Sequence, residues 1–197
     1  GAINAIGHNV EETWKSIKDG VCGIGEITNY DNSLTKVKIA GEVKDFNVAD
    51  YLDKKAARKM DRFTQFGVIA AREAFKDSGL EIDKINADRF GVAVSSGIGG
   101  IGTIEKDHSK ALQKGYDRVS PFFVPMAITN LAAGNIAIDL GARGMCTCPV
   151  TACAGGTNAI GDAFRNIRDG YQDIMVAGGA EASITPLGVG GFTSMKA

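Results

Sequence analysis

One stretch constrains the fold more than any other: an apolar run that ends in a cysteine and continues as a helix. It reads Val-Thr-Ala-Cys-Ala-Gly-Gly-Thr-Asn-Ala-Ile-Gly over residues 150–161, and its helical character continues to about Arg168. The runs over residues 90–95 and 174–177 are almost entirely apolar, as in strands that are covered on both faces. This alternation of strands and helices predicts an α/β fold with a parallel-rich sheet between layers of helices.

Cys153 falls at the turn between the predicted strand and the predicted helix. The first N–H groups of a helix have no partner inside it, and the helix dipole favours an anion there. A thiolate is such an anion, and it is the nucleophilic form of cysteine. A cysteine among alanines is also commonly a small buried side chain, so position alone leaves both interpretations open.

Apolar spacing predicts the remaining helices and strands. In chain order they are a helix from Asn9 to Ile17 with Trp14 and Ile17 facing inward, a half-buried strand over residues 36–43, a charged surface segment over 50–59, a core helix over 61–78, and a buried helix over 126–140 that breaks near Gly134. In the helix after Cys153, the same spacing predicts an inward face made of Ala154, Thr157, Ile160, Gly161 and Phe164.

Charge and composition exclude several functional classes. Lys and Arg number 22 against 23 Asp and Glu, so no nucleic-acid partner is expected. No apolar run approaches the roughly 20 residues that span a bilayer, so no membrane segment is expected. The four cysteines are unevenly spaced and no secretory leader precedes them, which favours reduced thiols in a cytoplasmic protein. Both ends are expected to be truncated, because the chain begins without Met and ends within a helical stretch.

The glycine-rich loop over residues 96–102 contains the pattern G-x-G-x-x-G between a strand and a helix, with Asp117 further on. A dinucleotide-binding oxidoreductase has such a pattern, but its acidic residue ends a second parallel strand. Here Asp117 lies in a polar turn, and residues 120–125 carry two prolines that do not suit a central strand. An NAD(P)-binding oxidoreductase is therefore a weak alternative, and no cofactor is expected.

Cys146 and Cys148 lie close to Cys153 in the sequence, so a metal centre has to be considered. Zinc and iron–sulfur sites use C-x-x-C units and four ligands. The pair here is C-x-C, and no histidine is nearby. No metal site is expected, and the two cysteines are interpreted as packing residues on one face of an extended segment over residues 145–150.

Several further motifs are specific when they are taken together and in order. They are Lys44-Asp45-Phe46, Met60-Asp61-Arg62-Phe63-Thr64-Gln65, Ser96-Gly97-Ile98-Gly99-Gly100, Ser120-Pro121-Phe122-Phe123-Val124-Pro125, the cysteine motif, Ala177-Gly178-Gly179-Ala180-Glu181 and Thr185-Pro186-Leu187-Gly188-Val189-Gly190-Gly191-Phe192. With this set the chain resembles the type II β-ketoacyl-acyl-carrier-protein synthases, the condensing enzymes of fatty-acid synthesis. The resemblance implies a thiolase-like fold of five layers, αβαβα. Residues 1–197 would form its first βα half, without the first strand and the whole C-terminal half.

The resemblance also implies an activity. Cys153 would take an acyl chain from an acyl-carrier-protein thioester, and malonyl-carrier protein would lose carbon dioxide and attack the Cys153 thioester, giving a chain two carbons longer. The Cys153 N–H would help to bind the oxyanion. The catalytic histidine pair, its supporting lysine and a phenylalanine amide would lie beyond residue 197, since His8 and His108 match neither histidine. This chain alone is therefore not expected to complete the condensation.

The resemblance further implies a binding pocket and partners. The residues that match its acyl pocket are Ile98, Phe123, Ala152, Gly188 and Phe192. Phe123 would reach a partner subunit, and a homodimer would form through the segment 145–150. The expected protein partner is acyl carrier protein. A ketosynthase domain of a polyketide synthase shares the cysteine motif and stays open as an alternative. A non-catalytic partner similar to a chain-length factor is disfavoured, because such proteins typically lack the nucleophile.

Overall fold

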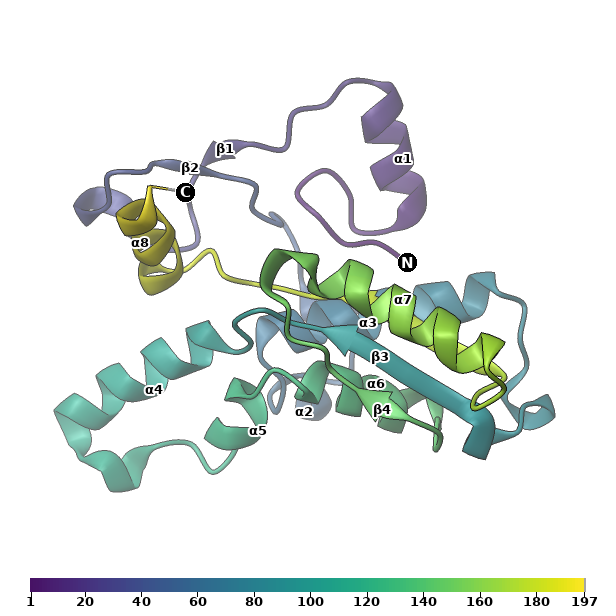
Figure 1. The fold of residues 1–197 in the computed structure, drawn as a ribbon. Coiled ribbons are helices and arrows are strands. Elements are labelled where there is room, and N and C mark those ends of the chain that lie inside the picture. The colour runs from purple at the N-terminus through teal and green to yellow at the C-terminus, as the bar shows by residue number, and fades with distance from the viewer. Residues whose placement is uncertain (197) are drawn as a thin grey trace.

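The computed structural model describes residues 1–196, and its centre is a parallel sheet of three strands (Figure 1). The strand order is β4 (Cys146–Thr147), β3 (Phe90–Ser95) and β5 (Ile174–Gly179). β3 pairs in parallel with both neighbours, and its register with β5 joins Phe90 to Ile174 and Ser95 to Gly179. Every residue of β3 is buried. The predicted α/β architecture and its buried central strand are therefore confirmed.

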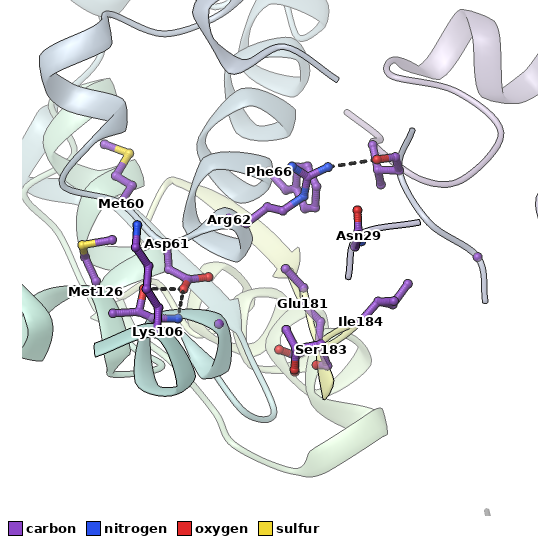
Figure 2. A pocket seen from close by; sticks show the side chains of 16 residues that line it. Asn29, Met60, Asp61, Arg62, Phe66, Lys106, Met126, Glu181, Ser183 and Ile184 are labelled. Atoms are coloured by element: carbon purple, nitrogen blue, oxygen red, sulfur yellow. Dashed lines mark hydrogen bonds between the residues drawn. The ribbon is translucent and has the colours of Figure 1, made fainter. Parts of the chain in front are cut away.

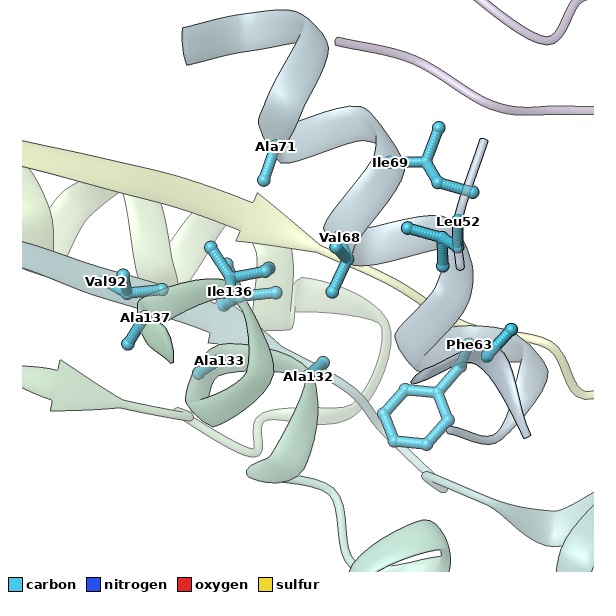
Figure 3. Packing of buried hydrophobic residues seen from close by; sticks show 12 residues of the cluster. Leu52, Phe63, Val68, Ile69, Ala71, Val92, Ala132, Ala133, Ile136 and Ala137 are labelled. Atoms are coloured by element: carbon cyan, nitrogen blue, oxygen red, sulfur yellow. The ribbon is translucent and has the colours of Figure 1, made fainter. Parts of the chain in front are cut away.

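Two helices, α3 (Arg62–Asp77) and α6 (Leu131–Leu140), cover one face of this sheet. Figure 3 shows Val68 and Ile136 where the two helices meet the sheet, and Phe63 at the start of α3 beside the first turn of α6. These side chains are large, and none of the three is more than 1% exposed. Asp61 caps α3 by accepting a hydrogen bond from the Phe63 N–H. The predicted core helix over residues 61–78 is confirmed.

α7 (Gly155–Arg168) covers the opposite face of the sheet (Figure 1), and its buried residues are all small. They are Gly155, Ala159 and Ala163, and the two alanines pack on Ala93 of β3. The predicted inward face was wrong, since Ile160 is 56% exposed and Phe164 is 62% exposed. Small residues let the helix backbone come close to the sheet, so the larger side chains turn away from it.

The remaining elements surround these layers. The helices are α1 (Val10–Lys18), α2 (Lys54–Ala57), α4 (Ile101–Lys114), α5 (Phe123–Ala127) and α8 (Pro186–Met195), and the strands β1 (Gly25–Glu26) and β2 (Ile39–Ala40) form a separate antiparallel pair. Short 3-10 helices cover Asn32–Leu34, Val48–Asp50, Ile82–Lys84, Ala87–Arg89, Tyr116–Arg118 and Ala152–Ala154. The predicted surface segment over 50–59 carries α2, but it also buries Leu52 and Ala57. The predicted domain range ends at Ala197, which lies outside the described residues.

The N-terminal segment departs from the sequence prediction in its burial. Asn9 caps α1 as expected, but Trp14 and Ile17 are both more than half exposed. Polar contacts hold this helix instead, because Glu73 of α3 accepts a hydrogen bond from the Val10 N–H at 2.8 Å. The predicted strand over residues 36–43 shrinks to β2, whose Ile39 is exposed, because the β1–β2 pair lies outside the parallel sheet (Figure 1).

The predicted buried helix over residues 126–140 is two helices, and the break was misplaced. α5 ends at Ala127 and α6 begins at Leu131, whereas Gly134 lies inside α6. The Gly100 N–H bonds to the Ala127 carbonyl at 3.0 Å, so the glycine-rich loop takes an acceptor at the end of α5. The break between α5 and α6 therefore coincides with the contact between the end of α5 and the glycine-rich loop, and not with Gly134.

Cys146 and Cys148 do not pack in the core of residues 1–196. Cys146 is exposed on β4, the edge strand of the sheet, and the half-buried Cys148 follows just after this strand. Their interpretation as packing residues is therefore not supported within this part of the chain. None of the helices in the described residues combines the length and apolar character needed to cross a bilayer.

Candidate active site

Cys153 lies at the carboxyl end of the parallel sheet, in the tight turn that leads into α7. The turn covers Ala152–Ala154, and the Gly155 N–H closes it by donating to the Ala152 carbonyl. Ala152 has a φ of 50°, which is uncommon for a residue with a side chain and costs free energy. The Cys153 side chain is exposed. The turn therefore presents a thiol beside the N-terminus of a 14-residue helix.

A cavity of about 800 Å³ opens beside the Cys153 thiol. Three of the predicted pocket residues, Ile98, Ala152 and Phe192, line it together with Cys153. They come from the glycine-rich loop, the cysteine turn and α8, which are far apart in the sequence and meet at one end of the sheet. The structure thus brings the nucleophile candidate and an apolar pocket together.

Gly188 and Phe123 do not line this cavity. Gly188 is buried in the first turn of α8, where its N–H donates to the Thr185 hydroxyl at 3.1 Å. A Cβ on Gly188 would lie 2.0 Å from the Ser183 carbonyl oxygen, so the backbone needs a glycine there. Phe123 is half-buried and begins α5. Any role of these two residues in the pocket stays a prediction.

Glu181, just after β5, holds the glycine-rich loop in place, a role that its sequence motif did not indicate. Its carboxylate accepts hydrogen bonds from the Gly97 N–H at 2.8 Å and the Ile98 N–H at 3.0 Å. The Ser96 hydroxyl donates to the same carboxylate at 3.3 Å and accepts from the Gly99 N–H. Glu181 therefore fixes the backbone of Ile98 at the cavity. The signal in the sequence is a carboxylate that follows the apolar run over residues 174–177, whose strand ends at the same edge of the sheet as the loop.

The same bonds argue against a dinucleotide site. A phosphate-binding loop presents free N–H groups to its ligand. Here the Gly97 and Ile98 N–H groups bond to Glu181, that of Gly99 to Ser96, and that of Gly100 to Ala127. Asp117 lies in the short 3-10 helix Tyr116–Arg118 and not at the end of a parallel strand. The loop is therefore a structural support of the cavity.

The other titratable candidates lie away from the thiol or are less reactive. Burial of part of its side chain raises the pKa of the Cys146 thiol, and the nearby Cys148 adds to this shift, so Cys146 forms less thiolate. A ring nitrogen of His8 lies 2.8 Å from the Lys44 carbonyl oxygen, and His108 is exposed on α4. Within residues 1–196, no group of three His, Cys, Asp or Glu side chains is arranged to hold a metal ion.

A second cavity, of about 430 Å³, shares Glu181, Ser183 and Ile184 with the first, and Figure 2 shows its lining side chains. Its polar side chains are largely engaged in the fold. Asp61 accepts hydrogen bonds from the Thr103 N–H and hydroxyl, the latter at 2.6 Å. Arg62 donates to the Val43 carbonyl at 2.9 Å, and its guanidinium lies 5.0 Å from the centre of the Phe66 ring. This cavity contains no thiol and belongs to the supporting structure.

Known proteins share the sequence and the fold of this chain. All 197 residues match the family model described as "Beta-ketoacyl synthase, N-terminal domain". The chain belongs to the beta-ketoacyl synthase family. It is 50% identical over 197 residues to the 3-oxoacyl-[acyl-carrier-protein] synthase 2 of Staphylococcus aureus. All of this chain and 49% of that relative are covered, so the chain spans about half the length of the curated relatives it matches.

Solved ketosynthase structures share the fold. The ishigamide ketosynthase/chain length factor matches with a TM-score of 0.92 and 28% identity, over all of this chain and 49% of that chain. A type II polyketide acyl-carrier protein in complex with its ketosynthase matches with a TM-score of 0.71 and 28% identity, over 78% of this chain and 44% of that one. The thiolase-like fold class is confirmed, and α3 with α6, the sheet, and α7 form three successive layers of it.

Proposed function

We propose that this chain provides the nucleophile and part of the acyl pocket of a 3-oxoacyl-[acyl-carrier-protein] synthase of fatty-acid synthesis. The observation that carries the proposal is the exposed Cys153 thiol at the start of α7, beside a largely apolar cavity, in a chain that belongs to this family. The 50% identity to a synthase of this kind, against 28% to the ketosynthase of the type II polyketide complex, favours fatty-acid over polyketide synthesis.

In the first half-reaction, the Cys153 thiolate attacks the carbonyl carbon of an acyl thioester. A C–S bond forms to Cys153, the bond to the carrier thiol breaks, and the proton lost by Cys153 balances the one gained by the departing thiolate. The N-terminus of α7 favours the anionic sulfur. Ile98, Ala152 and Phe192 would surround the acyl chain, since they line the same cavity.

In the second half-reaction, a malonyl thioester loses carbon dioxide, and its carbanion attacks the Cys153 thioester carbon. The electrons move onto the carbonyl oxygen and then return to expel the Cys153 thiolate, which releases a 3-oxoacyl thioester. Among residues 1–196, the Cys153 N–H donates no hydrogen bond, so it is free to bind the oxyanion. Neither His8 nor His108 lines the cavity, so we assign the stabilisation of the carbanion to histidines outside this chain.

The partners are part of the proposal. One of the related structures is a ketosynthase in complex with an acyl carrier protein, which supports a carrier protein as the acyl donor. β4 pairs only with β3 among the described strands, so its other edge is open to pair with a second copy of the chain. We therefore propose a homodimer through residues 145–150. We also propose a cytoplasmic enzyme, on the ground that all four cysteines are free thiols.

The proposal is tested by alkylation of the complete gene product with iodoacetamide across pH, with each cysteine followed by peptide mass spectrometry. We expect Cys153 to react faster than the other three cysteines over the whole pH range, as an activated nucleophile would. Cys22 is exposed and serves as the internal control. Cys153→Ala should abolish condensation, whereas Cys22→Ala should not alter it. An inert Cys153, or an active Cys153→Ala variant, would show that the assignment is wrong.

A further inference from the structure

The contact between strand β3 and the first turn of α7 is closer than two side chains permit. An ideal Cβ placed on Gly155 would lie 1.9 Å from the Ser95 Oγ and 2.8 Å from the Ser95 Cβ. Real Cβ atoms essentially never come within 3.0 Å of another group. The Ser95 side chain therefore occupies the space that any side chain at position 155 would need.

The Ser95 hydroxyl makes no hydrogen bond within residues 1–196 that would explain why position 95 is a serine. The residue is 2% exposed, and its hydroxyl has no hydrogen-bond partner in the described part of the chain. Burying such a hydroxyl without a partner costs free energy. The backbone of Ser95, in contrast, is hydrogen-bonded: its carbonyl accepts a hydrogen bond from the Ala180 N–H at 2.9 Å. What the side chain does provide is volume beneath Gly155.

A neighbouring contact makes the geometry of this turn clearer. Ser95 and Gly179 are register partners at the ends of adjacent strands, and the two glycines that open α7 each rest on one of them. A Cβ on Gly179 would lie 3.2 Å from the Gly156 Cα, which is tight. The Ser95–Gly155 contact leaves far less room, so it limits how closely the start of α7 can approach the sheet.

The position of Gly155 is coupled to that of Cys153. The two residues are separated only by Ala154, and the hydrogen bond from Gly155 to Ala152 closes the turn around Cys153. Ala152 is already in an uncommon backbone conformation, so this turn has few alternative arrangements. A shift of Gly155 away from Ser95 would therefore move the Cys153 thiol within the cavity, which Ser95 also lines.

We propose that Ser95 and Gly155 form a size-matched pair that positions the Cys153 thiol for reaction. Ser95 is a positioning residue: it acts through the backbone of Gly155 and does not touch the reacting atoms. The contact between β3 and α7 needs one hydroxymethyl group, and either position 95 or position 155 can carry it. This inference rests on the proposed role of Cys153 as the nucleophile.

The test compares Gly155→Ser, Ser95→Gly and the double exchange Ser95→Gly/Gly155→Ser in the complete gene product. Gly155→Ser inserts a second side chain, so we expect slower Cys153 alkylation with an altered pH profile, and a fall in kcat/KM of about 100-fold, as expected for a reacting group misplaced by about 1 Å. The double exchange returns one hydroxymethyl group to the contact, so it should recover most of both losses. Gly161→Ser is the matched control on the same helix, because no atom lies within 4 Å of a Cβ there, and it should change neither quantity.

The outcomes separate this inference from the proposed function. An inert Cys153 in the unaltered protein overturns the proposed function and this inference with it. A reactive Cys153 whose alkylation is unchanged by Gly155→Ser overturns this inference alone, as does a double exchange that is no better than Gly155→Ser. If Gly155→Ser fails to fold, the double exchange decides: a folded protein with a reactive thiol supports the pair, and an unfolded one overturns it.

Discussion

The two faces of the parallel sheet are built on opposite packing rules. On the α3–α6 face, large side chains such as Phe63 and Ile136 form one buried cluster with Val92 of β3. On the α7 face, the buried residues are glycine and alanine, and backbone approaches backbone. The first face is therefore sensitive to the removal of atoms, and the second to their addition.

This difference has a functional consequence. The face with large side chains holds the sheet and stays away from the thiol. The face with small residues brings the start of α7 onto the carboxyl ends of β3 and β5, where Cys153 meets the cavity. Close backbone packing leaves little freedom for the cysteine turn, which suits a group that has to be held in one place.

The largest effect on stability is expected from Phe63→Ala. Phe63 is fully buried between α3 and α6, and its loss removes apolar contacts and leaves a cavity. We expect the free energy of unfolding to fall by about 3–5 kcal/mol, measured by urea denaturation of the complete gene product. Leu34→Ala is the control, because Leu34 is 98% exposed. Equal losses for the two variants would mean that this face is not a packed core.

The fold was predicted best where hydrophobic pattern and burial coincide. A short, continuous apolar run suits a strand that is covered on both faces, and β3 matches the predicted residues 90–95. α3 follows its predicted range because its large apolar residues recur at helical spacing and Asp61 caps it. The prediction failed for α7, since periodicity assumes that the larger apolar residues face inward, whereas Ala159 and Ala163 do so here.

The candidate site was only partly accessible to sequence reasoning. Cys153 could be proposed from the chain itself, because an apolar run, a cysteine and a helical run follow one another in the sequence. The meeting of Ile98, Ala152 and Phe192 at one cavity depends on which strand ends lie side by side, and was expected only from the family resemblance. The role of Glu181 depends on hydrogen bonds from Gly97 and Ile98, which lie more than 80 positions away in the sequence, so no local pattern could indicate it.

Glu42 tests a region that relies on neither packing rule. It is 1% exposed, and its carboxylate accepts from the Asn29 N–H at 2.9 Å and from the Thr28 N–H and hydroxyl. Burial raises the pKa of this carboxyl, but the hydrogen bonds from Asn29 and Thr28 outweigh it and hold the pKa below its usual range. Glu42→Gln should cost about 1.5–3 kcal/mol near neutral pH.

The pH dependence of Glu42 has a definite sign. Because its pKa is lower in the folded state, its contribution is fully present above the unfolded value of about 4.3, and it is lost as the pH falls through the folded value. The difference in Tm between the unaltered protein and Glu42→Gln should therefore shrink as the pH is lowered from neutral towards 3. A difference that is constant over this range would contradict the assigned role.

On the α7 face, Ala159→Leu tests the sensitivity to added atoms. Ala159 is fully buried against β3, so a larger side chain has to push α7 away from the sheet. We expect a loss of about 1–3 kcal/mol in the free energy of unfolding, together with slower alkylation of Cys153. Ala49→Leu, at an exposed position in a short 3-10 helix, is the control and should change neither quantity. A stabilised Ala159→Leu variant would show that this contact has room to spare.

The smallest effect is expected from Asp139→Asn at the rim of the α3–α6 face. Arg72 donates two hydrogen bonds to Asp139, at 2.7 and 2.6 Å, and so joins the two helices outside the apolar core. Because 45% of the Arg72 side chain is exposed, water screens the pair, and the loss should be about 0.2–1 kcal/mol and smaller in high salt. Glu81→Gln, in a more exposed ion pair with Lys84, is the control. A loss near that of Phe63→Ala would mean that an ion pair, and not the large side chains, holds α3 to α6, and the contrast between the two faces would no longer rest on packing.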